Sequence, residues 1–192
     1  MKHRITRLAL TRLLLCCTVS FAAIVTAQAQ MSMSVTANPT PAQTYDKLLS
    51  GMEKEITSAA EAMPADKYDF APPQGEFKGV RTFGQQVKHL AEANYEFFEG
   101  WNVGTPVDSD AIEKLTTKAD ILKALADSYV YAHKAIDTIT AANAFDSLGK
   151  DKGTRAGMAT FCLAHSMDHY GQIVVYLRMN GIVPPASRKS ST

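Results

Sequence analysis

The stretch FCLAHSMDHYGQIVVYLRMNGIVPP, Phe161 to Pro185, decides the fold, because it has the length and apolar content of one long helix. Gly181 is a natural residue for ending that helix, and the two prolines that close the stretch cannot continue it. Two histidines, His165 and His169, stand in the middle of this apolar sequence. Being four residues apart, they lie about 40° apart around a helix and about 6 Å apart along its axis, so they share one face.

Three earlier segments carry the same helical periodicity, with apolar residues at every third or fourth position. Two of them begin with a threonine that can cap a helix, in "TPAQ" at Thr40 and in "TKAD" at Thr117. We expect helices over residues 40–63, 82–101, 117–139 and 154–180. No segment shows the alternating pattern of a strand. The sequence therefore predicts an all-α fold, a four-helix bundle with a long crossover connection between helices 2 and 3, over residues 102–117.

The first 29 residues have the order of a bacterial export signal. Met1 to Arg12 holds four positive charges and no acid, Leu13 to Val25 is apolar, and Ala27 to Ala29 supplies the small residues of a cleavage site. We therefore expect the protein to be exported to the periplasm or out of the cell, with no stable membrane anchor after the signal is cleaved. An uncleaved anchor is the alternative, although the apolar run is short for a bilayer. We divide the chain into a cleaved signal peptide, a flexible tail, the bundle and a C-terminal tail, at 1–29, 30–39, 40–185 and 186–192.

Cleavage changes the charge and the cysteine content of the chain. Of 20 Lys and Arg residues four precede the cleavage site, which leaves 16 against 19 acidic residues. No basic run remains, so we do not expect nucleic-acid binding. Cys162 is then the only cysteine, and no internal disulfide can form. Its spacing with the apolar stripe of the last helix favours a small buried residue over a reactive or metal-binding thiol.

The histidine pair has more than one interpretation at this stage. Two rings four residues apart can direct a nitrogen at one cation, which is a common way for a helix to supply two metal ligands. They can equally be hydrogen-bonded core residues, or solvent-exposed residues at the open end of the bundle. The pattern does not select a third ligand. His89 lies about 100° from the centre of its apolar stripe, as a solvated residue would, and His133 lies at the edge of its own stripe.

Two motifs give the chain a resemblance to a known family. "TFGQQVKHLAEAN" (82–94) and "HSMDHYGQIVVYLRMNGIVPP" (165–185), in this order and spacing, resemble the DinB-like superfamily of metal-binding four-helix bundles, over about residues 40–185. That family takes one histidine from the second helix and two from the last. The resemblance therefore implies that His89, His165 and His169 bind a divalent metal ion, most often zinc or nickel, and that the protein forms a homodimer.

A metal ion held by three histidines keeps at least one coordination position open, which is typical of catalytic sites. This implies metal-dependent hydrolysis or the thiol transfer of several relatives, although an export signal argues against thiols of the bacterial cytoplasm. The substrate is unknown. The alternatives are a non-catalytic cell-envelope protein that binds metal or a small ligand, and a haem protein without c-type attachment, because no C-x-x-C-H occurs. Four polar residues are candidates for orienting a ligand or substrate: Gln172, Asn94, Glu96 and Asp168.

Overall fold

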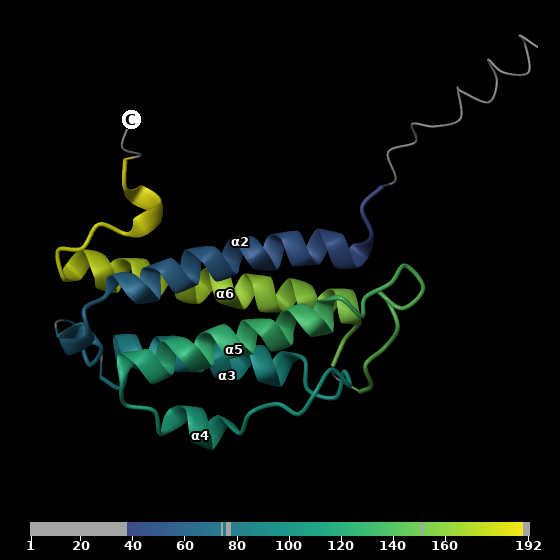
Figure 1. Ribbon diagram of the computed structural model, residues 1–192, viewed down its shortest axis with the longest axis horizontal. Coiled ribbons are helices and arrows are strands. Elements are labelled where there is room, and N and C mark those ends of the chain that lie inside the picture. Colours follow the sequence, from purple (N-terminus) through teal and green to yellow (C-terminus); the bar gives the residue numbers. More distant parts are fainter. Residues whose placement is uncertain (1–37, 74, 76–77, 151, 190–192) are drawn as a thin grey trace, which may run out of the picture. The chain divides into compact units, whose positions relative to one another are not determined.

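Four long helices dominate the computed structural model, which describes residues 38–73, 75, 78–150 and 152–189 (Figure 1). Three short helical segments lie in the connections and after the last long helix, and no strand occurs in the described ranges. The long helices are α2 (Pro41–Ala62), α3 (Phe83–Phe97), α5 (Lys118–Ile136) and α6 (Arg155–Met179). The short ones are η1 (Ala65–Lys67), α4 (Ser109–Glu113) and η2 (Pro185–Ser187).

All of these helices lie in one unit, Pro39–Thr192. The predicted signal peptide and residues 30–37 of the predicted tail lie outside the described residues. Among the helices that are described, none combines the length and the apolarity needed to cross a lipid bilayer.

The helix ends follow from local capping chemistry. The hydroxyl groups of Thr40 and Thr82 each accept a hydrogen bond from the backbone N–H of the glutamine three residues later. The side-chain oxygen of that glutamine accepts a hydrogen bond from the backbone N–H of the threonine. Just after the C-terminal end of α6, Gly181 has a φ of 72° and Ile182 donates its N–H to the Leu177 carbonyl at 2.9 Å. Glycine adopts this left-handed conformation without strain, so the predicted end of the last helix is confirmed.

Each of α2 and α3 packs against both α5 and α6 (Figure 1). α3 and α5 run in the same direction, since Tyr131 near the end of α5 donates its hydroxyl to the carbonyl of Phe98, just after α3, at 3.2 Å. The connection between them, which contains α4, therefore returns along the length of the bundle. This confirms the predicted all-α bundle with a long crossover between its second and third long helices.

α3 is shorter than expected, because it ends at Phe97 rather than near residue 101. Gly100 and Asn102 both have left-handed backbone conformations, with φ of 81° and 59°, which a continuing helix does not allow. The turn brings Trp101 back onto the core, where the guanidinium of Arg155 lies 4.5 Å from the centroid of a tryptophan ring that is only 5% exposed. The apolar pattern thus continued past the helix because Trp101 is buried by the turn.

The core consists of apolar side chains from all four long helices. Burying one large side chain of this kind stabilises the folded state by about 1.5–3 kcal/mol. Completely buried examples are Leu49 and Ile56 of α2, Leu90 of α3, Leu125 of α5 and Ile173 of α6.

α6 is apolar around much of its circumference because it lies against both α2 and α3. On the side of α6 away from the histidines, the sequence forms a second apolar stripe of five residues, Leu163, Met167, Tyr170, Val174 and Leu177. Three of them, Leu163, Tyr170 and Leu177, pack on the core. Tyr170 also donates its hydroxyl to Glu55 of α2 at 2.9 Å. Met167 of the same stripe is exposed. Most of the second stripe is therefore covered within the bundle itself.

His133 joins α5 to α2 through two carboxylates. Its Nδ1 lies 2.5 Å from Oδ1 of Asp46, and its Nε2 lies 3.1 Å from Oε2 of Glu53. Burial lowers the pKa of the ring, but the hydrogen bonds and negative charges of the two acids outweigh burial and raise it above its ordinary value. The charged form of His133 therefore stabilises the contact between α2 and α5.

We predict that His133→Ala lowers the free energy of unfolding by about 1 kcal/mol at about pH 5.5, a small value because the ion pairs are partly exposed. The folded protein binds this proton more tightly than the unfolded chain does. The contribution is therefore complete below the unfolded-state pKa of about 6.5 and is lost as the pH rises through the folded-state pKa. Urea unfolding of both proteins between about pH 5.5 and pH 9 should show their difference shrinking.

The matched control for this prediction is Lys123→Ala, which removes an exposed ion pair with Asp127 inside α5. Its effect on the free energy of unfolding should stay the same across this pH range, because the pair contains no histidine. A difference between parent and His133→Ala that stays constant or grows with pH would contradict the ion-pair account.

Candidate metal centre

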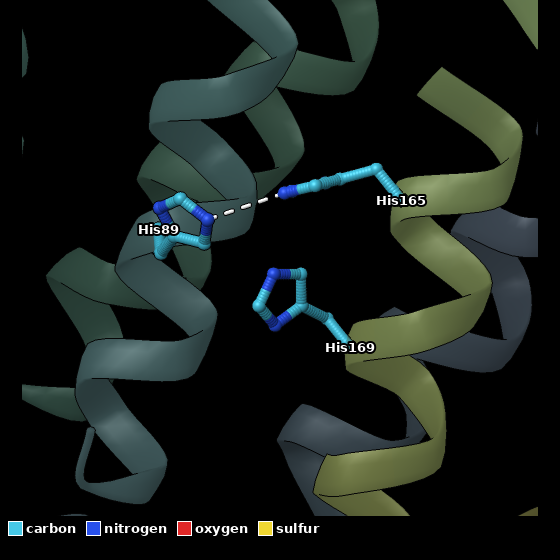
Figure 2. Close-up of side chains that lie close together, drawn as sticks. All are labelled: His89, His165 and His169. Carbon is cyan, nitrogen blue, oxygen red and sulfur yellow. Dashed lines mark hydrogen bonds between the residues drawn. The ribbon is translucent and has the colours of Figure 1, made fainter. Parts of the chain in front are cut away.

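Three histidines from two helices converge where α3 packs on α6 (Figure 2). His89 projects from the middle of α3, and His165 and His169 project from successive turns of α6. The Nε2 atoms of His89 and His165 are 3.2 Å apart, and one nitrogen from each of the three rings lies within 4.8 Å of the others. The structure therefore brings together the three histidines that the family resemblance selected.

The packing of α3 explains why His89 reaches the pair, although the helical pattern placed it on a flank. The centre of the apolar stripe of α3 faces α5, where the side-chain amide of Asn94 donates to the hydroxyl of Ser128 at 3.1 Å. α6 covers the neighbouring flank, on which Gln86 and His89 lie one turn apart. His89 is consequently half-buried between two helices. Periodicity shows where the core is, but it does not show which flank a neighbouring helix covers.

The three rings are neutral at pH 7. Burial, followed by the charges of Arg81 and the neighbouring rings, lowers the pKa of His89 to about 4. Burial and His165 lower the pKa of His169 to about 4 as well, although Asp168 acts in the opposite direction. Burial also lowers the pKa of His165. A neutral imidazole offers a lone pair, so this cluster can accept a cation without first losing protons.

A chain of hydrogen bonds fixes which nitrogen of His169 faces the other rings. Its Nδ1 donates to Oε1 of Gln86 at 2.7 Å, and Nε2 of Gln86 donates to Oε1 of Gln172 at 2.8 Å. Nε2 of Gln172 then donates to Oδ2 of Asp168 at 3.0 Å. Because Nδ1 carries the proton, Nε2 of His169 keeps its lone pair, and Figure 2 shows one nitrogen of this ring turned toward the other two rings. Two residues that the sequence suggested for orienting a ligand, Gln172 and Asp168, therefore belong to this chain.

Gln86 itself was not among the candidates from the sequence. It is only 2% exposed and lies on the same flank of α3 as His89. A buried glutamine indicates a hydrogen-bonded position, because its side-chain amide needs partners in the interior. Those partners come from α6, however, and nothing in the sequence around Gln86 identifies them.

The remaining two candidates occupy other positions. Asn94 lies in the core, where its side chain bonds Ser128 and accepts the thiol of Cys162 at 3.7 Å. Burial raises the pKa of that thiol to about 12, as expected for an apolar residue rather than a ligand. Glu96 is exposed, and its charge raises the pKa of His165, so it lies within electrostatic reach of the cluster. Their roles toward a ligand stay predictions.

Glu92, which the sequence did not single out, lies beside His89. Its Oε2 is 3.9 Å from Nδ1 of that ring, and its side chain is 15% exposed. Its Oε1 is buried and has no hydrogen-bond partner. Burial, helped by the charges of Glu113 and Glu96, raises the pKa of Glu92. The sequence signal was the i,i+3 spacing of His89 and Glu92, which places two side chains on adjacent turns of one helix.

The cluster fits a divalent transition-metal ion. Imidazole nitrogens suit zinc, nickel and copper. Two nitrogens that each lie about 2.1 Å from one ion are about 3.0–3.4 Å apart, and those of His89 and His165 are 3.2 Å apart. The rings of Phe97 and Phe161 lie 5.1 and 6.4 Å from that of His165. Of these two rings, that of Phe161 is exposed and that of Phe97 is half-buried.

Comparison with protein families identifies a match. A sequence model described as the DinB superfamily matches residues 48–173, which is more than half of the chain. The matched span begins in α2, ends in α6 and contains all three histidines of the cluster. A search of curated proteins found no significant match.

We predict that Gln86→Leu weakens zinc binding about ten- to hundredfold, because it removes the acceptor that holds Nδ1 of His169. Competition against a chromophoric chelator measures the affinity. Asp168→Ala, which removes only the far end of the hydrogen-bond chain, should have the smaller effect. Equal affinities of Gln86→Leu and the parent would contradict an orienting role for Gln86.

We also predict an unusual pH dependence of metal binding. Protons compete with a metal for His89 and His169 only when the pH approaches their pKa of about 4. Zinc affinity should therefore change little between about pH 8 and pH 6 and fall steeply below about pH 5. Histidines with an ordinary pKa of about 6.5 would already lose affinity as the pH falls below about 7. Titration calorimetry at several pH values distinguishes the two profiles.

Proposed function

The chain belongs to the DinB superfamily, and on this premise we propose that it binds a divalent metal ion, zinc or nickel, through His89, His165 and His169. We further propose that the open coordination position serves hydrolysis or group transfer on a small molecule. The observation that carries the proposal is the convergence of three neutral imidazoles from two helices, two of them with Nε2 atoms 3.2 Å apart.

The exposure of the cluster supports an open site over a closed structural one. A metal ion held by three nitrogen ligands keeps a position for an exogenous ligand and acts there as a Lewis acid. His169 is buried, whereas His89 and His165 are half-buried, so one side of the cluster faces solvent. Within the described residues, the group that could hold a metal ion consists of these three side chains. Closed structural zinc sites use four protein ligands.

The side chains around the cluster indicate what kind of molecule it would accept. The exposed ring of Phe161 and the half-buried ring of Phe97 offer an apolar surface beside His165. The charge of Arg81 lowers the pKa of all three histidines, and the same positive potential favours an anionic group in this place. These features favour a small substrate that has both an apolar part and a negative charge.

Two chemistries remain open for this site. Hydrolysis needs a base, and Glu96 is a carboxylate within electrostatic reach of the cluster. Thiol transfer needs a small thiol, and the predicted export would remove the protein from the thiols of the cytoplasm. We therefore favour hydrolysis. A non-catalytic protein that binds metal or a small ligand in the cell envelope is the alternative, because it requires no base at all.

Export and dimerisation are further parts of the proposal. Export rests on the charged, apolar and small-residue order of residues 1–29, which lie outside the described residues. A homodimer would cover exposed apolar side chains of α6 that lie apart from the cluster, such as Met167 and Val175. Light scattering coupled to size exclusion measures the mass in solution, and a monomer at all concentrations would contradict the dimer.

We predict that each of His89→Ala, His165→Ala and His169→Ala lowers zinc and nickel affinity at least a hundredfold, because each removes one of three ligands. The purified protein should gain thermal stability on adding zinc, and the three variants should not. His133→Ala is the matched control, since it removes a half-buried histidine that pairs with carboxylates in a different part of the bundle. A His89→Ala protein that binds zinc as tightly as the parent would show that the third ligand is another residue.

A panel of small esters, amides and thiol acceptors, tested with the metal-loaded protein, distinguishes enzyme from binder. Turnover of an ester or amide that a chelator abolishes and zinc or nickel restores supports hydrolysis. Turnover only in the presence of a thiol supports transfer. Tight metal binding without turnover of any member supports the non-catalytic alternative.

A further inference from the structure

One carboxylate oxygen of Glu92 is buried and has no hydrogen-bond partner. Among the buried side-chain oxygen and nitrogen atoms of the described residues, its Oε1 is one of two without a hydrogen bond. An unpaired buried acceptor costs free energy, so a native structure rarely keeps one without a use. The ammonium group of Lys88 acts on this carboxylate through its charge but does not hydrogen-bond it, because it binds the carbonyls of Glu113 and Leu115 at the end of α4.

The carboxylate of Glu92 lies next to the ring nitrogen of His89 that faces away from the cluster. Oε2 is 3.9 Å from Nδ1, while Nε2 of the same ring is 3.2 Å from Nε2 of His165. An imidazole that presents Nε2 to a cation carries its proton on Nδ1, and that proton needs an acceptor. A small rotation of either side chain would bring Nδ1 and the carboxylate into hydrogen-bond distance.

At His169 the corresponding hydrogen bond from Nδ1 to a side-chain oxygen is already formed. Its Nδ1 donates to Oε1 of Gln86 at 2.7 Å, on the side of the ring away from the other histidines. Gln86 and Glu92 both belong to α3, so one helix supplies an oxygen to a histidine of α6 and another to its own histidine. The two residues flank His89 in the sequence, three positions before it and three positions after it.

We propose that Glu92 is the positioning residue of His89: its carboxylate accepts the Nδ1 proton and fixes the ring with Nε2 turned toward His165 and His169. This inference rests on the proposed metal binding. The inference goes beyond metal binding because it assigns a hydrogen-bond partner to His89, the one ligand that α3 contributes. Direct ligation by Glu92 is the competing role, and the position of the carboxylate on the Nδ1 side of the ring argues against it.

Zinc affinity of a set of matched variants tests the proposal. Glu92→Met keeps the volume of the side chain and removes both acceptors, so affinity should fall about ten- to hundredfold. Glu92→Gln keeps one acceptor oxygen and should lose less than about threefold. Glu99→Met removes the same charge from an exposed position just after α3 and should leave affinity unchanged. Circular dichroism confirms that each variant is helical.

Nitrogen-15 spectra of the histidine rings give a second readout, which does not depend on affinity. In the parent and in Glu92→Gln, with and without zinc, the Nδ1 proton of His89 should be present and slow to exchange. In Glu92→Met this signal should be lost, while the Nδ1 proton of His169, held by Gln86, persists. This comparison still applies if affinity cannot be measured in one of the variants.

The outcomes separate this inference from the proposed function. A parent protein that binds neither zinc nor nickel overturns the metal function. A parent that binds zinc while Glu92→Met binds it equally well overturns only the role of Glu92. If Glu92→Gln loses as much affinity as Glu92→Met, the carboxylate acts as a ligand or as a charge, and the proposal is wrong. If Glu99→Met loses as much affinity as Glu92→Met, the effect is general electrostatics and the proposal is equally wrong.

Discussion

α3 and α6 run in opposite directions and meet at several levels along their contact. Gln86 meets Gln172 at one level, His89 meets His165 and His169 at the next, and the rings of Phe97 and Phe161 meet near the far end. A shift of one helical turn would move the partners about 5.4 Å apart and separate the imidazoles. The side-chain bonds on one side of the cluster and the aromatic contact on the other therefore fix the register that the site needs.

The crossover connection has a consequence for the same site. Because α3 and α5 are parallel, the chain must return along the bundle between them, and α4 packs against α3 on the way. Lys88 of α3 donates to carbonyls at the end of α4, and its neighbour Glu92 is largely shielded from solvent. The crossover connection thus places α4 against the side of α3 that carries Lys88.

The fold and part of the site could be predicted from the sequence, for different reasons. The helices, their threonine caps and the end at Gly181 are local properties, and the sequence encodes them directly. The pair His165 and His169 is also local, since both residues lie on one face of one helix. The place of His89 in the cluster came from resemblance to a family, because its own helical pattern indicated a solvated residue. Gln86 and Glu92 escaped prediction because their significance depends on which helix covers which flank, and that is a tertiary property.

The thiol of Cys162 is held at the centre of the bundle, against the side-chain oxygen of Asn94, with no surface exposed. A sulfur atom in such surroundings resists ionisation, and ionisation is the step that starts exchange with another sulfur. While the helices stay packed, this chain cannot become crosslinked to a neighbouring molecule through Cys162 under oxidising conditions. A covalent dimer joined at this residue would therefore be evidence that the bundle had opened.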